Sequence, residues 1–238
     1  MDNKEFVKKL VDIAENYKTL YVMGCFGAPL NSSNKERYCT NHSYNKNSVR
    51  QKMIKSASAD TFGFDCVNLI KAVLWGWDGD KSKTYGGAKY VTNGVPDISA
   101  DGMIAKCQNV STDFSKIAIG EAVWMPGHIG IYIGNGLAIE CTPAWKNCVQ
   151  ITSCNCTKNG YNRRDWLQHG KLPYITYIKE EKKKLETGND IVWELMNGKY
   201  KVKIDDASRA IKALDKAKNN PDFMSLYWIL YKVVNGNG

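Results

Sequence analysis

The stretch "AVWMPGHIGIYIGNGLAIECTP", from Ala122 to Pro143, decides the class of fold. Two runs of alternating apolar residues flank a glycine-containing loop at 134–136, and this pattern predicts a β-hairpin. Two further segments, "CVQITSC" at 148–154 and "YITYI" at 174–178, are predicted to add strands. Helical patterns come before these strands. The order therefore favours an α+β domain, with helices on an antiparallel sheet, over repeated βαβ units.

The helical patterns lie mainly in the first third of the chain. Residues 1–17 place apolar side chains on one stripe, and residues 61–76, "TFGFDCVNLIKAVLWG", predict a second amphipathic helix. Shorter helices are expected at 48–59 and 97–107. Residues 31–47 are polar and are predicted to be irregular, and the Gly- and Asp-rich residues 76–95 predict a surface loop.

The composition changes after residue 178. Residues 179–187 mix charges and predict a solvated linker, whereas residues 188–238 contain three short helical patterns. We therefore expect a main domain at 1–178, a charged linker at 179–187 and a small three-helix module at 188–238.

Charge and cysteine content narrow the class of protein. The chain has 238 residues and a net charge of +9, which favours an anionic partner. Its basic residues do not interleave with aromatics as a nucleic-acid groove requires, so we expect no nucleic acid. No apolar run could cross or enter a membrane, and the N-terminal helix lacks the apolar core of a secretory signal. Because the secretory signal is lacking, the eight cysteines are expected to be reduced thiols. Their spacing includes no C-x-x-C pair, so no metal site is expected.

Cys66 is the candidate nucleophile. Asp65 is a good N-cap residue, which puts Cys66 at the first position of the predicted helix. The helix dipole and free backbone N–H groups at that position are expected to favour the reactive thiolate. A structural cysteine at the helix start is the alternative.

A nucleophilic cysteine needs a base, and the chain offers three histidines. His42 lies in a polar loop and is expected at the surface. His169, in "DWLQHGKLP", is expected near a helix end as a cap or surface residue. His128 opens the first strand of the hairpin, so it is the candidate base, and a core histidine with satisfied hydrogen bonds is the alternative.

Glu140 is the candidate residue that orients His128. If residues 134–136 form a three-residue loop, Gly130 lies opposite Glu140, and His128 and Glu140 share one face of the hairpin. A two-residue turn would put Glu140 on the opposite face. An ordinary solvent-facing glutamate is the alternative.

These residues resemble the NlpC-type cysteine peptidases of bacterial cell-wall turnover. "FDCVNLI", then "GHIGIYIGNG", then a polar residue twelve positions after the histidine, follow the family's order, and "YVMG" supplies Tyr21 in an upstream element. The resemblance covers about residues 20–177 and implies a papain-like domain with Cys66, His128, Glu140 and Tyr21 in the site. Two positions depart from the family: Val67 replaces a frequent Ser, and Glu140 replaces His, Asn or Gln. The related CHAP amidases share the Cys-then-His order and often use an acidic third residue, so the branch stays open.

The resemblance implies hydrolysis of an amide bond in the peptidoglycan stem peptide, most simply by an endopeptidase, without a cofactor. The tail, residues 188–238, is similar to the helical wall-binding repeats of some phage lysozymes, which together with the catalytic pattern implies an endolysin. An endolysin waits in the host cytoplasm and then acts on the wall, where teichoic acid is a second candidate partner for the basic surface. The alternatives are a CHAP-type N-acetylmuramoyl-L-alanine amidase, a cysteine peptidase or acyltransferase acting on proteins or lipids, and a non-catalytic anion-binding protein.

Overall fold

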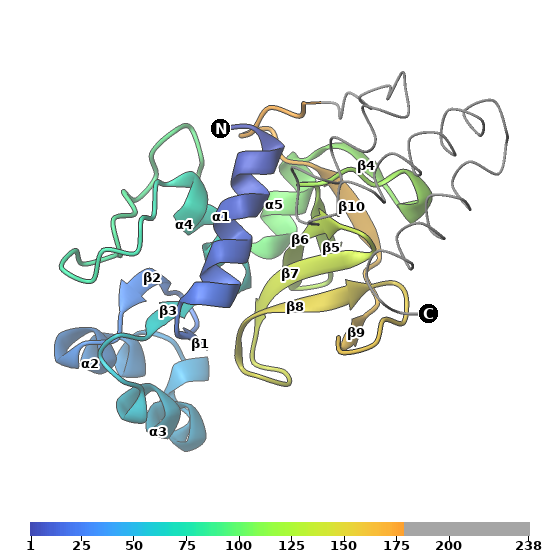
Figure 1. Ribbon diagram of the computed structural model, residues 1–238. Helices are drawn as coiled ribbons and strands as arrows, with labels where there is room; N and C mark the ends of the chain where they lie inside the picture. Colours follow the sequence, from blue (N-terminus) through green and yellow to red (C-terminus); the bar gives the residue numbers. More distant parts are fainter. Residues whose placement is uncertain (179–238) are drawn as a thin grey trace, which may run out of the picture. The chain divides into compact units, whose positions relative to one another are not determined.

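The computed structural model describes residues 1–178, which form one compact unit (Figure 1). Its helices are α1 (Asn3–Asn16), α2 (Ser32–Asn41), α3 (Ser48–Ser56), α4 (Cys66–Leu74) and α5 (Ala100–Lys106), with 3-10 helices η1 (Tyr44–Lys46) and η2 (Phe114–Lys116). Its strands are β1 (Thr19–Tyr21), β2 (Phe26–Pro29), β3 (Phe62–Phe64), β4 (Gln108–Ser111), β5 (Ala122–Met125), β6 (His128–Gly134), β7 (Leu137–Thr142), β8 (Cys148–Cys154), β9 (Arg163–Arg164) and β10 (Gln168–Lys171). The α+β class is thus confirmed. The predicted linker 179–187 and module 188–238 lie outside the described residues.

A curled seven-stranded sheet forms the centre of this unit, in the order β4-β10-β5-β6-β7-β8-β9. Its neighbours pair antiparallel except at one edge, where β9 runs parallel to β8. The sheet is therefore mixed rather than purely antiparallel. A second sheet of three short strands, in the order β1-β3-β2, leads directly into α4. None of the described helices is long and apolar enough to cross a membrane.

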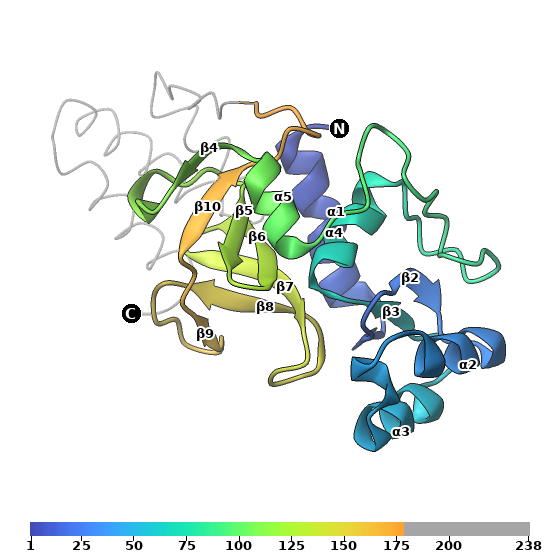
Figure 2. The same cartoon turned by 180° about the vertical axis from the view of Figure 1, so that it is seen from behind.

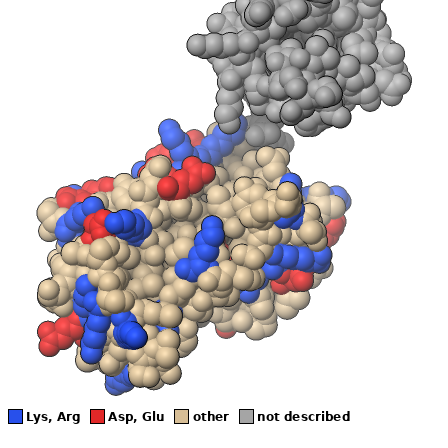
Figure 3. All heavy atoms as spheres, turned by 60° about the horizontal axis from the view of Figure 1, so that its bottom comes forward, with Lys and Arg blue, Asp and Glu red and all other residues tan. Residues whose placement is uncertain are grey.

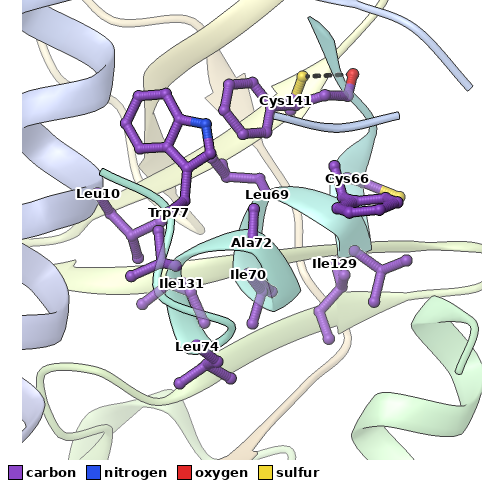
Figure 4. Close-up of a cluster of buried hydrophobic side chains, with 14 of the residues drawn as sticks. Leu10, Cys66, Leu69, Ile70, Ala72, Leu74, Trp77, Ile129, Ile131 and Cys141 are labelled. Carbon is purple, nitrogen blue, oxygen red and sulfur yellow. Dashed lines mark hydrogen bonds between the residues drawn. The ribbon is translucent and has the colours of Figure 1, made fainter. Parts of the chain in front are cut away.

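The main core lies between the seven-stranded sheet and the helices α1 and α4 (Figures 1 and 2). On α1, the predicted stripe of Phe6, Leu10 and Ile13 is buried, and the Asp2 side chain caps the helix by accepting from two backbone N–H groups. Every side chain of α4 is buried, and its apolar residues lie over Ile129 and Ile131 of β6 (Figure 4). Burial on all sides holds α4 rigidly against the hairpin.

The hairpin of β6 and β7 has the predicted register but reaches it by a different turn. Asn135 and Gly136 both have positive φ, 52° and 67°, as a two-residue type I′ turn requires. Gly134 pairs with Leu137, and the extra residue Ile133 forms a bulge before Tyr132 pairs with Ala138. The bulge adds one residue to β6 and so compensates for a turn that is one residue shorter than predicted. His128 and Glu140 therefore share a face, although the predicted three-residue loop is wrong.

Two local predictions are also wrong. Residues 31–47 are not irregular, because α2 and η1 occupy most of them. Asn31 caps α2, and the helix buries a face that contains Asn34 and Tyr38, four residues apart. The contacts of this face stabilise the helix although its sequence has only a weak apolar periodicity. Residues 174–178 form no strand, and the single bridge between Asp2 and Thr176 is their only ladder contact with the described chain. The other predicted elements near the site are present.

Candidate active site

Cys66 begins α4, as the sequence predicts. The Asp65 carboxylate caps the helix by accepting from the Asn68 backbone N–H at 2.8 Å. The same carboxylate accepts from the Gly24 N–H at 2.8 Å, which ties the loop after β1 to the start of α4. Cys66 is buried, with 7% of its surface exposed. The cap and the β3–α4 junction thus fix the position of the thiol.

The thiol does not have the low pKa that we expected from its place on the helix. Burial, and then the neighbouring Asp65 carboxylate, raise the pKa of Cys66 to about 12. The backbone N–H groups of Cys66, Val67 and Ile129 act in the opposite direction but do not outweigh burial. The thiol at rest is therefore protonated, and a base has to remove its proton during attack.

His128 and Glu140 form the pair that the hairpin register predicts. The His128 Nε2 lies 2.6 Å from a carboxylate oxygen of Glu140, whose side chain is fully buried. Nδ1 of the same ring makes no hydrogen bond to a residue of the described chain. Gly130 of β6 lies on the same face as His128 and Glu140, and a Cβ there would approach the Ile139 carbonyl oxygen of β7 to 2.7 Å. The solvent-facing alternative for Glu140 is therefore wrong.

Two further side chains, which sequence reasoning missed, hold Glu140. Arg164 of β9 donates to both carboxylate oxygens, at 2.8 and 3.2 Å, and Thr152 of β8 donates at 2.7 Å. Burial alone would raise the pKa of Glu140, but the bonds from His128 and Arg164 outweigh it and hold the pKa below the usual value. Glu140 is therefore an ionised, doubly anchored partner for the histidine.

Aromatic rings complete the surroundings of His128. The Trp166 ring stacks on the His128 ring, with centroids 5.4 Å apart and planes 8° apart. The Arg164 guanidinium lies over the rings of Trp145 and Trp166, at 4.6 and 5.9 Å. In the sequence, "RRDW" at 163–166 is the one signal for this group, because it places a cation and a large aromatic two residues apart.

A cavity of about 460 Å³ opens beside the Cys66 thiol. Its walls include Tyr21, His42, Gly127 and Asp97. The Tyr21 pKa is raised by burial and then by the nearby Cys66 and Asp65, so its hydroxyl stays protonated and can donate a hydrogen bond. Asp97 accepts from Tyr90 at 2.8 Å and pairs with the buried Lys71. The cavity is therefore polar on one wall and large enough for a few residues of a peptide.

The structure brings Cys66 next to the first residues of β6. The Ile129 backbone lies against the thiol, and Figure 4 shows Cys66 and Ile129 where α4 crosses the strand. Cys66 and His128 make no hydrogen bond to each other within residues 1–178. Catalytic hydrogen bonds are often long in unliganded sites and tighten when substrate binds. Three of the four predicted residues thus gather around the start of β6 and α4, and Glu140 joins them through His128.

The other two histidines occupy different places. His42 is exposed, as predicted, at the C-terminal end of α2, although it also lines the cavity. His169 is not at a helix end, because it lies in β10 and is buried. Its Nδ1 bonds to the Glu121 carboxylate and its Nε2 lies 3.0 Å from the Asp113 carbonyl. Both ring nitrogens of His169 are therefore occupied.

Residues 1–178 contain no cluster of three or more His, Cys, Asp or Glu side chains that could hold a metal ion. The eight cysteines, all within this part, are free. No protein-family model matches the chain, and no curated protein matches it.

Proposed function

We propose that this protein is a peptidoglycan hydrolase of the NlpC type, with a papain-like domain that cleaves an amide bond in the stem peptide of the wall. The observation that carries the proposal is the 2.6 Å bond between His128 and Glu140, on a hairpin against which α4 presents Cys66. A nucleophile at a helix start, a base and a group that orients the base are the three parts of nucleophilic amide hydrolysis.

The first half of the reaction forms a thioester. His128 Nδ1 takes the proton of the Cys66 thiol as the sulfur attacks the amide carbonyl, and the Glu140 carboxylate stabilises the resulting imidazolium. The Cys66 backbone N–H and the Tyr21 hydroxyl donate to the oxyanion that forms. The imidazolium then protonates the leaving amine as the C–N bond breaks, which leaves the acyl group on sulfur.

The second half releases the product. Water attacks the thioester while His128 accepts one of its protons, and that proton returns to the Cys66 sulfur as the carboxylic acid product leaves. Side chains and water complete every step, so the proposal requires no cofactor. The high pKa of Cys66 makes His128 an active base rather than the partner of a preformed thiolate.

The proposed substrate and setting follow the resemblance to wall peptidases. An endopeptidase cutting within the stem peptide is the primary proposal, and a CHAP-type amidase cutting the muramoyl amide is the alternative. The protein would act as an endolysin, held in the host cytoplasm until the membrane opens. The cavity beside Cys66 supports a peptide substrate, because it is open and lined by donors and acceptors.

The variant Cys66→Ala tests the proposal most directly. We expect clearing of purified bacterial walls to fall by at least about 10³-fold, because the nucleophile acts in the chemical step, while circular dichroism stays unchanged. Cys107→Ala is the matched control, since that half-buried thiol lies away from the cavity. Mass spectrometry of the released fragments names the bond that is cut. Wall clearing by Cys66→Ala at the wild-type rate would contradict the proposal.

A further inference from the structure

The positive charge of the described chain is concentrated in one lobe. Residues 31–56, which form α2, η1 and α3, contain six Lys or Arg and one Glu, a net charge of +5. The other residues of 1–178 contain 15 basic and 14 acidic side chains, a net charge of +1. The space-filling view shows Lys and Arg over this lobe with little acidic surface between them (Figure 3).

The cations of this lobe are uncompensated. Within residues 1–178, none of the six forms an ion pair with a carboxylate. Lys46, Lys52 and Lys55 are exposed, whereas Arg50 is 7% exposed and bonds only neutral groups, including the Tyr21 carbonyl and Asn147. A buried cation without a carboxylate is costly, so the lobe is suited to an anion supplied from outside.

A hollow of about 620 Å³ lies beside Arg50 and is lined by Ser43, Tyr44, Asn47 and Val49. The Tyr44 ring lies under the Arg50 guanidinium and packs edge-on against Tyr21, with centroids 5.8 Å apart. Tyr21 also lines the cavity beside Cys66. The Tyr44–Tyr21 contact therefore connects the hollow to the cavity of the candidate active site.

We propose that the α2–η1–α3 lobe docks the phosphodiester backbone of an anionic wall polymer of the teichoic acid type. This inference rests on the proposed function, because it places a partner of the wall next to the site that cuts the wall. A single-stranded nucleic acid fits less well. Its bases need several open aromatic platforms. Tyr44 is the one exposed Phe, Tyr or Trp of residues 31–56, and part of its ring is already in contact with Arg50 and Tyr21.

Binding of the full-length Cys66→Ala protein to purified walls tests the docking surface without cutting the walls. We compare Lys46→Gln/Lys52→Gln/Lys55→Gln with the control Lys4→Gln/Lys8→Gln/Lys116→Gln, which removes the same charge from exposed positions outside the lobe. The first triple variant is expected to bind polymer-bearing walls at least about tenfold more weakly, and the control to change less than about twofold. On walls stripped of the polymer by hydrofluoric acid, the difference between the variants should disappear, and all three proteins should bind equally.

A second pair of variants tests the hollow itself. Val49→Glu adds a carboxylate at the lip of the hollow, at an exposed position in the first turn of α3 where an acidic residue is tolerated. Val110→Glu is the control at a similarly exposed valine of β4. Val49→Glu should weaken wall binding by about fivefold or more, and Val110→Glu should not.

Several outcomes would overturn the docking surface. Equal losses in the two triple variants, a loss in the first triple variant that persists on stripped walls, or tighter binding of single-stranded DNA than of the polymer through the same lysines would each do so. The lysine variants with Cys66 intact should digest stripped walls at the wild-type rate. Failure of that digestion in every protein, wild type included, contradicts the hydrolase proposal and leaves the binding measurements to be judged separately.

Discussion

Two histidine–carboxylate pairs occur in the seven-stranded sheet, and they differ in what the histidine can still do. His128 bonds Glu140 through Nε2 and leaves Nδ1 without a partner in the described chain. His169 bonds Glu121 through Nδ1 and the Asp113 carbonyl through Nε2, so both of its nitrogens are occupied. Each ring has an aromatic neighbour, Trp166 for His128 and Phe114 for His169.

The comparison shows that a histidine–carboxylate pair alone does not identify an active site. The side chains of His169 and Glu121 are each 5% exposed, and their bonds join β10 to the residue before β5 and to the residue before η2. The His128 pair has a free ring nitrogen, a nucleophile beside the start of its strand and a cavity next to that nucleophile. Availability for proton transfer therefore separates the candidate catalytic pair from the structural one.

Replacing the two histidines should produce the largest contrast. His128→Ala is expected to lower wall clearing by at least about 10³-fold. It should change the free energy of unfolding by about 1 kcal/mol, since Arg164 and Thr152 still hold Glu140. His169→Ala should cost about 3–5 kcal/mol, because it leaves the buried Glu121 without its partner. Clearing assays and urea denaturation of both variants measure this. Equal activity losses per folded molecule would erase the distinction between the pairs.

Replacing the two carboxylates should give the next largest effect. Glu140→Gln keeps the shape of the side chain but removes the charge that stabilises the imidazolium, so we expect kcat to fall by about 10–100-fold. Glu121→Gln should leave kcat of the folded protein unchanged. Steady-state rates on solubilised wall fragments measure both. A loss with Glu140→Gln as complete as that of Cys66→Ala would mean that Glu140 does more than orient His128.

Arg164 is predicted to be a positioning residue with a modest effect that depends on pH. Because the pKa of Glu140 is lowered in the folded protein, the ionised carboxylate stabilises the fold above pH 4.5, the ordinary pKa of the group. This stability is lost as the pH falls below 4.5. Arg164→Gln should raise the pKa of Glu140, so the acid limb of the kcat/KM profile should move to higher pH, with a loss of about three- to tenfold near neutral pH. Arg164→Lys should restore part of the shift. A profile that keeps its shape would assign Arg164 a purely structural role.

The aromatic neighbours should give the smallest difference. Trp166→Phe retains a ring against His128, so a change of about two- to threefold in kcat is expected. Phe114→Leu, next to His169, should leave kcat unchanged. The same steady-state assay compares the two variants, and a larger effect from Phe114 would contradict the assignment of the pairs.

Much of the candidate site was predictable from the sequence because it depends on local patterns. The N-cap Asp65 places Cys66 at the helix start, and the alternating apolar residues place His128 and Glu140 on the two strands of one hairpin. The predicted three-residue loop of the hairpin is wrong, since the bulge at Ile133 depends on cross-strand pairing that the residue types do not reveal. Residues 31–47 were misjudged because the apolar period of α2 is weak.

The α+β class and the helix that begins at Cys66 follow from the sequence alone, because capping and the periods of helices and strands act over short distances. The tertiary structure is needed to place His128 and Glu140 on one face through the bulge at Ile133, to bring Arg164 and Thr152 to Glu140, to bury His169 and to raise the pKa of Cys66. Arg164 reaches Glu140 through the parallel pairing of β9 with β8, and burial depends on the whole core. Such long-range contacts leave no periodic signal in the sequence, which is why the partners of the site emerged only from the fold.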